Sequence, residues 1–146
     1  MKVKLAETAG FCAGVKRAMD LVLRSAQENV PGRLFTWGPL IHNPQVVDFL
    51  ASRKIYVAKD YEDLSPGDAV VTRSHGIPPE VRDRLGSMDL SVCDATCPKV
   101  ARVQGIVRKH ARDGYRVLIF GDEGHAEVNA LLAFAEGAGA VILSED

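Results

Sequence analysis

The sequence predicts an α/β fold with a mostly parallel sheet, and two observations carry this prediction. Short runs rich in β-branched and aromatic residues, typical of buried strands, alternate with longer segments whose apolar residues recur at helical spacing. Strands joined in sequence by helices pair in parallel, so this alternation is typical of an α/β domain. Strands are expected over residues 3–7, 33–37, 54–58, 68–72, 90–94, 115–120 and 140–143.

Helices are expected between several of these strands. The first covers residues 13–29, where apolar residues recur every three to four positions and a Pro-Gly pair follows. The second begins at Asn43, a favourable N-cap, with Pro44 at its first helical position. Further helices are expected to begin at residues 78–80, near Pro98 and near Glu127, and a turn is expected over residues 65–68.

Composition and charge limit the classes of function. There are 18 Lys and Arg against 19 Asp and Glu, so the formal net charge of -1 offers no overall field to attract nucleic acid or an acidic membrane. No apolar run approaches the roughly 20 residues of a membrane span, and a signal peptide is not recognised. We therefore expect a cytoplasmic protein without nucleic-acid or membrane partners. Three cysteines without a secretory signal favour metal or thiol chemistry over disulfides.

The residues best able to do chemistry follow the predicted strands. In a parallel sheet, the loops at the carboxyl ends of the strands converge, and helix N-termini there present free N–H groups, so ligands usually bind at this edge. The sequence therefore predicts one site assembled from several loops. Its candidate residues are Cys12, His42, His75, Cys97, His125 and Glu127.

Two of the three cysteines differ from the third. Cys12 lies between two glycines and Cys97 lies before Pro98, so each begins a predicted helix, where the dipole and free N–H groups favour a thiolate. Such thiolates suit metal binding or nucleophilic attack. Cys93 lies within an apolar strand and is interpreted as a buried structural residue.

The three histidines in the candidate set, His42, His75 and His125, fit more than one role. Each alone is equally well explained as a structural imidazole, but together they offer zinc ligands or donors to an anion. The sequence contains no Cys-x-x-Cys or His-Glu-x-x-His pair, which counts against zinc, and no P-loop signature. His110 lies in a charged helical segment and is given no role.

The sequence contains five short motifs: FCAGVKRA at Phe11, IHNPQVV at Ile41, SHGIP at Ser74, DATCPKV at Asp94 and GHAEV at Gly124. In this order they resemble the motifs of a known family, the 4-hydroxy-3-methylbut-2-enyl diphosphate reductases (LytB or IspH). The resemblance implies an iron-sulfur enzyme that removes the hydroxyl of an allylic diphosphate, giving isopentenyl and dimethylallyl diphosphates for isoprenoid synthesis by the methylerythritol phosphate route. It also implies an external electron donor such as ferredoxin or flavodoxin.

The resemblance implies a [4Fe-4S] cluster. Cys12 and Cys97 resemble two of its three thiolate ligands, leaving one iron free to bind the substrate oxygen. The family's third cysteine comes after the last residue of this sequence. Cys93 precedes Cys97 by only four residues, in a strand where the family usually has an apolar residue, so it is a poor replacement.

The resemblance also implies roles for the remaining candidates. His42, His75 and His125 resemble residues that face the substrate and its diphosphate. Glu127 resembles the acid that delivers protons, which is needed because hydroxide is a poor leaving group. The family has proline where this chain has Ala126, a change that removes backbone stiffness but keeps the neighbouring His and Glu.

The family's architecture implies a domain division. The chain resembles the first one and a half domains of a three-domain α/β trefoil, with residues 1–97 as the first domain and residues 98–146 as the start of a truncated second. The first strand is expected to belong with the missing third domain, so the C-terminal domain is an expected partner. Two alternatives stay open: a non-enzymatic module that binds phosphate or a partner, and a zinc or thiol enzyme on the same loops.

Overall fold

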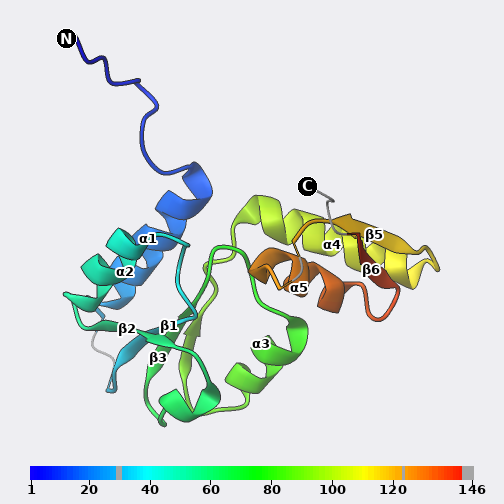
Figure 1. The fold of residues 1–146 in the computed structure, drawn as a ribbon. Helices are drawn as coiled ribbons and strands as arrows, with labels where there is room; N and C mark the ends of the chain where they lie inside the picture. Colours follow the sequence, from blue (N-terminus) through cyan, green and yellow to red (C-terminus); the bar gives the residue numbers. More distant parts are fainter. Residues whose placement is uncertain (29–30, 123, 143–146) are drawn as a thin grey trace.

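The computed structural model describes residues 1–28, 31–122 and 124–142 (Figure 1). Helices and strands alternate along the chain, as predicted. The helices are α1 (Ala13–Ser25), α2 (Pro44–Ala51), α3 (Pro79–Gly86), α4 (Pro98–Arg112) and α5 (Ala126–Phe134), and a short 3₁₀ helix covers Tyr61–Asp63. The strands are β1 (Leu34–Trp37), β2 (Ile55–Ala58), β3 (Ala69–Thr72), β4 (Ser91–Cys93), β5 (Val117–Phe120) and β6 (Gly139–Ile142).

The described strands form two parallel sheets. Four of them pair in the order β2-β1-β3-β4, with Leu34 of the central strand opposite Ile55 on one side and Ala69 on the other. Strands β5 and β6 pair separately, also in parallel. The α/β class with a mostly parallel sheet is therefore confirmed. All the loops that follow β1, β3 and β4 emerge at one edge of the larger sheet, because parallel strands share their carboxyl ends.

Apolar clusters cover both faces of the larger sheet. Helices α1 and α2 pack on one face and α3 on the other (Figure 1). Neighbouring residues of a strand point to opposite faces, so Val71 joins the first cluster and Val70 the second. The first cluster includes Ala18, Val22, Leu34, Val46 and Leu50, and the second includes Phe35, Trp37, Ile77 and Leu85.

The smaller sheet has a thinner core. Its buried cluster consists of Val107, Phe134 and Ala135, with Val117 and Leu131 packed against it. Burying one large aliphatic side chain stabilises a fold by roughly 1.5–3 kcal/mol, so the larger sheet is the firmer frame for the site.

Residues 3–7 do not form the predicted first strand. They are irregular, and the Val3 and Leu5 side chains are 79% and 87% exposed. β-branched residues favour a strand only where a neighbouring strand offers hydrogen-bonding groups, and neither sheet of the described residues offers one here. Cys12 consequently follows no strand, contrary to the expectation, and instead serves as the N-cap residue of α1.

The other predicted boundaries need smaller corrections. Helix α1 ends at Ser25, four residues before the predicted end, because Gln27 and Glu28 close turns onto Arg24; residue 29 lies outside the described residues. Residue 143, the predicted end of the last strand, lies outside them too. Asn43 caps α2 as predicted, accepting a hydrogen bond from the Val46 N–H at 3.3 Å. The described ranges contain no helix with the length and apolar character of a membrane span.

Candidate functional site

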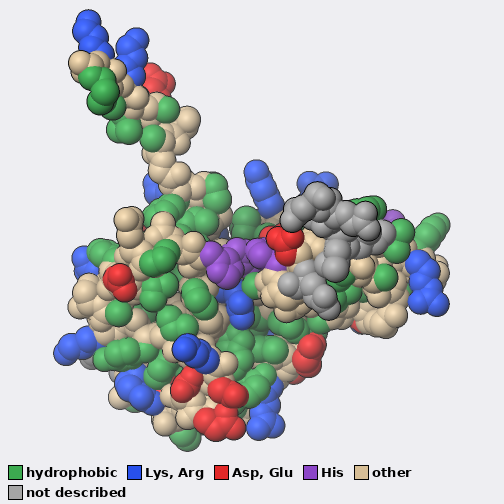
Figure 2. Space-filling view, in the orientation of Figure 1, with side chains coloured by type: hydrophobic (Ala, Val, Ile, Leu, Met, Phe, Trp, Pro, Cys, Tyr) green, Lys and Arg blue, Asp and Glu red, His purple; other side chains and the backbone are tan. Residues whose placement is uncertain are grey.

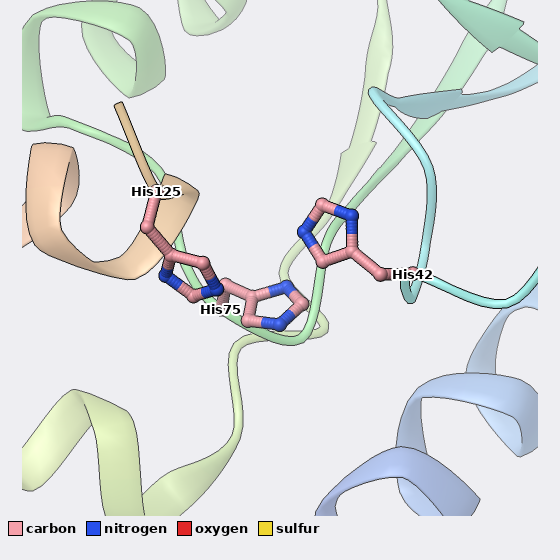
Figure 3. Close-up of side chains that lie close together, drawn as sticks. All are labelled: His42, His75 and His125. Carbon is pink, nitrogen blue, oxygen red and sulfur yellow. The ribbon is translucent and has the colours of Figure 1, made fainter. Parts of the chain in front are cut away.

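Three histidines from separate loops meet at one place, here called the histidine triangle (His42, His75 and His125). They follow β1, β3 and β5 respectively, and Figure 3 shows the three rings grouped with their nitrogens near one another. The ring centroids are 5.0 Å apart for His42 and His75, 5.6 Å for His75 and His125, and 5.8 Å for His42 and His125. One nitrogen from each ring lies within 4.8 Å of the others. In Figure 2 the histidines form a surface patch with an acidic side chain beside it.

Ser74 ties together the loops that carry these histidines. Its N–H and its hydroxyl both donate to the Leu40 carbonyl, each at 3.3 Å, which joins the loop before His42 to the loop before His75. Its own carbonyl accepts from the Cys97 N–H at 2.9 Å. Ser74 is buried, so water does not compete for these bonds. One residue therefore links the histidine triangle to the start of α4.

The turn after His75 depends on glycine. Gly76 has a φ of 79°, a left-handed conformation that side chains disfavour. A Cβ at this position would also lie 3.2 Å from Thr96 Cγ2 and would collide with Gln104 Nε2. The chain can therefore turn sharply here and present His75 toward His42 and His125.

The surroundings of His75 disfavour its charged form. Burial lowers the pKa of its imidazole below the usual 6.5, and the neighbouring His42, His125 and Arg73 lower it further. Its Nδ1 is buried and has no hydrogen-bond partner among the described residues. A buried ring nitrogen without a partner is costly, so the triangle is suited to a ligand that supplies one.

His125 and Glu127 share the start of α5. His125 is the N-cap residue, and its Nδ1 accepts a hydrogen bond from the Glu127 N–H at 3.3 Å. In a neutral ring that accepts at Nδ1, the hydrogen is on Nε2, which is then free to donate. Glu127 lies in the first turn of α5 and is partly buried. The structure thus places the two residues of the GHAEV motif side by side on one helix turn.

Two thiols meet at a second place, here called the cysteine pair (Cys12 and Cys97). They are the N-cap residues of α1 and α4, and both are free. Gly14 lies between them: a Cβ there would be 2.5 Å from the Cys97 sulfur and 3.9 Å from the Cys12 sulfur. Both sulfurs therefore lie within 4 Å of one point. They line a pocket of about 350 Å³ together with Gly14, Arg17 and Pro98.

Cys93 does not join the cysteine pair. Its side chain packs against the cluster on the α1 face of the sheet and borders a different hollow, lined also by Leu21 and Ser25. Its interpretation as a structural residue fits this place.

Asp94 organises the loop that leads to Cys97. Its Oδ1 accepts hydrogen bonds from the Thr72 hydroxyl at 3.1 Å and from the Thr96 N–H at 2.8 Å, and its Oδ2 accepts from Arg82 at 2.7 Å. Burial works to raise the pKa of Asp94, but the Thr96 hydrogen bonds and the Arg82 charge outweigh it and hold the pKa below 3.8. Asp94 was not among the site residues predicted from the sequence. An Asp two residues before a Thr is a local turn signal that could have identified it.

The edge of this α/β sheet thus offers two kinds of ligand. The cysteine pair provides soft sulfur donors, which suit iron, copper or zinc. The histidine triangle provides N–H donors and ring nitrogens, which suit an anion or a divalent metal. Fold and site together define an α/β protein with two candidate binding positions, a soft-metal position (the cysteine pair) and an anion position (the histidine triangle).

Comparison with known proteins assigns the family. The family described as LytB protein matches residues 3–146, and the chain belongs to that family. It is 40% identical to the 4-hydroxy-3-methylbut-2-enyl diphosphate reductase of Solidesulfovibrio magneticus, over 99% of this chain and 52% of that protein. It is 43% identical to the protein of the same name from Aquifex aeolicus, over 94% of this chain and 48% of that protein.

Solved structures agree in fold. One of (E)-4-hydroxy-3-methyl-but-2-enyl diphosphate reductase superposes with a TM-score of 0.82 at 42% identity, over 97% of this chain and 50% of the other. The structure of the E-1-hydroxy-2-methyl-but-2-enyl-4-diphosphate reductase from Plasmodium falciparum gives a TM-score of 0.87 at 26% identity, over 93% and 42%. The chain spans about half the length of the relatives it matches.

Proposed function

We propose that the chain supplies the cysteine pair and the histidine triangle of a 4-hydroxy-3-methylbut-2-enyl diphosphate reductase. The reaction removes the allylic hydroxyl with two electrons and protons, giving isopentenyl and dimethylallyl diphosphates for isoprenoid synthesis. The observation that supports this most is the hydrogen bond from the Cys97 N–H to the Ser74 carbonyl. It joins the soft-metal position to the anion position, and the reaction requires both.

Cys12 and Cys97 would hold an iron-sulfur cluster. Soft thiolates are its usual ligands, and both sulfurs can reach one group because they lie within 4 Å of a single point beside Gly14. Such a cluster supplies electrons and a Lewis-acidic iron when it is bound. Cys93 borders another hollow, so we propose that a third thiolate comes from the part of the relatives that this chain does not span.

The histidine triangle would bind the diphosphate. His125 has a free Nε2–H, and His75 has a buried Nδ1 without a partner among the described residues, so both rings gain a hydrogen bond or a proton from a phosphate. Helix α5 begins directly after His125, so the positive end of its dipole favours an anion at the triangle.

Glu127 would deliver the proton that lets the hydroxyl leave as water. It follows His125 by two residues on the same helix turn, so the acid lies close to the residues that would bind the substrate. Electrons would come from an external donor such as ferredoxin or flavodoxin.

The test is substrate binding by the iron-loaded chain, and turnover with reduced ferredoxin once the C-terminal part of a relative is supplied. We expect 4-hydroxy-3-methylbut-2-enyl diphosphate to bind to the wild type, and to be reduced when that part provides the third thiolate. Glu127→Gln should bind the substrate equally well without turnover, because the amide cannot donate the proton as an acid. Failure of the wild type to bind the substrate would overturn the proposal, and undiminished turnover in Glu127→Gln would remove that residue from the acid role.

The histidine triangle also favours a second candidate, a zinc site. Three ring nitrogens within 4.8 Å of one another need to move little to bind one ion, and a neutral His75 is the form that binds metal. Cobalt(II) binding to a chain with all three cysteines changed to serine distinguishes a zinc site from an anion site. A tetrahedral cobalt absorption spectrum that pyrophosphate does not change would favour the zinc site.

A further inference from the structure

The start of α1 is held against the loop that precedes Cys97 by one side chain. Arg17 donates from Nη1 to the Thr96 carbonyl at 3.1 Å and from Nη2 to the Asp94 carbonyl at 3.4 Å. It therefore bridges the helix that begins after Cys12 and the loop that ends at Cys97. Arg17 also lines the pocket that contains both sulfurs.

Few other hydrogen bonds fix this end of α1, although Val15 of its first turn packs against the core cluster. The middle of the helix packs on the sheet through Ala18 and Val22, which are fully buried. The first turn lacks a side-chain cap, because Cys12 makes no capping hydrogen bond. Residues 1–12 are exposed, so the preceding chain does not hold the turn either.

We propose that Arg17 is a positioning residue that sets the separation of the Cys12 and Cys97 sulfurs. The inference rests on the proposed function, in which the cysteine pair binds one group. The guanidinium is planar, and its two terminal nitrogens can donate to two neighbouring carbonyls at once, which keeps the first turn of α1 in one orientation over the loop. Gly14 permits the close approach that this orientation requires, since any Cβ there would meet the Cys97 sulfur.

The chain offers a matched control on the same helix. Arg24 is exposed, and its Nε donates to the Asp20 carbonyl at 3.3 Å within α1. Arg24→Gln removes the same charge from the same helix without touching the loop. Arg17→Lys keeps the charge of Arg17 but cannot donate in a planar fork to both carbonyls.

The experiment measures how well the two thiols act together. Phenylarsine oxide condenses with two thiols, forming two As–S bonds and releasing water, so its affinity reports their separation. It is titrated into the full chain carrying Cys93→Ala, which leaves only the cysteine pair. We expect one arsenical per chain, bound about tenfold more weakly after Arg17→Gln, as expected for lost charged hydrogen bonds. Arg24→Gln should bind as the parent does, and Arg17→Lys should lie between.

The outcomes separate this inference from the proposed function. Equal affinity in Arg17→Gln and its parent would overturn the positioning role alone. Two arsenicals per parent chain, one on each thiol, would overturn the cysteine pair and with it the proposed function. Single alkylation by iodoacetamide, with circular dichroism, shows whether each thiol stays accessible in a folded chain. If Arg17→Gln does not fold, the test uses Arg17→Lys instead. An affinity of Arg17→Lys for phenylarsine oxide equal to that of the parent chain would overturn the inference.

Discussion

The cysteine pair and the histidine triangle are linked through Ser74 but are held in different ways. The histidines follow strands of the two sheets, and buried Ser74 joins two of their loops. Cys12 instead follows an irregular, exposed segment and depends on how α1 lies over the loop before Cys97. The soft-metal position and the anion position should therefore be separable by mutation. The cysteine pair should be displaced more easily than the histidine triangle.

Gly14→Ala should have the largest effect, and it should act on the cysteine pair without affecting the histidine triangle. The new methyl group would lie 2.5 Å from the Cys97 sulfur, which can rotate away, and 3.1 Å from the Cys97 Cβ, which must move by a few tenths of an ångström. We expect iron uptake to fall by most of its value while the melting temperature changes little and pyrophosphate binding stays the same. Iron content per chain after reconstitution measures this. Gly86→Ala is a matched control, since no atom lies within 4 Å of its added Cβ; a similar iron loss there would contradict the explanation.

His75→Asn should act on the other position. It removes the half-buried ring of the triangle, and we expect pyrophosphate to bind about tenfold more weakly, the usual cost of losing a charged hydrogen bond. Iron uptake should not change. Isothermal titration measures the affinity, with His110→Asn as the control because His110 lies on α4, where its Nδ1 donates to the Ile106 carbonyl of the same helix. Weaker binding in the control alone would place the anion elsewhere.

Acid pH should strengthen anion binding at the histidine triangle severalfold. The pKa of His75 is below 6.5 in the free chain, because of burial and the neighbouring His42, His125 and Arg73. A bound anion favours the protonated ring, so binding takes up a proton and strengthens as pH falls from 8 toward 6. Pyrophosphate affinity across this range checks the sign. Pyrophosphate itself takes up protons in this range, so His75→Asn is titrated alongside: an equal pH dependence in that variant would show that charge on His75 does not assist binding.

Asp94→Asn should give the smallest effect, on stability. The depressed pKa of Asp94 means that its carboxylate contributes stability above about pH 4, and that this contribution is lost as pH falls through the folded-state pKa. We expect the variant to lose about 1 kcal/mol of unfolding free energy at pH 7, and the difference to vanish in acid. Urea unfolding at several pH values measures it. A difference that persists at low pH would show that the lost bonds do not depend on charge.

Structural features that depend on residues close together in the sequence could be predicted, whereas several features that depend on distant parts of the chain could not. Asn43 and Pro44 start α2 as expected, because capping depends on residues three positions apart. Residues 3–7 have a strand's composition but no partner strand among the described residues, and composition carries no information about partners. The loops of His42 and His75 could be predicted to converge because β1 and β3 are parallel strands of one sheet, whereas His125 follows β5 of the separate sheet.

Other parts of the site could not be predicted from the sequence, because they depend on contacts with main-chain atoms and on long-range packing. Arg17 donates to main-chain carbonyls of Thr96 and Asp94, and carbonyls carry no sequence signal. The meeting of Cys12 and Cys97 depends on the same long-range packing. The iron-sulfur assignment of that pair derives from the family resemblance, and it stays a prediction until iron is measured.

The most direct test of that central claim is iron and acid-labile sulfide per chain after anaerobic reconstitution with a small monothiol present to supply a third ligand. We expect near-stoichiometric cluster in the wild type and in Cys93→Ser. Less than about a tenth of that amount should remain in Cys12→Ser or Cys97→Ser, since a thiolate-held cluster needs both sulfurs. Cluster content that is unchanged in Cys97→Ser, or that depends equally on Cys93, would contradict the assignment.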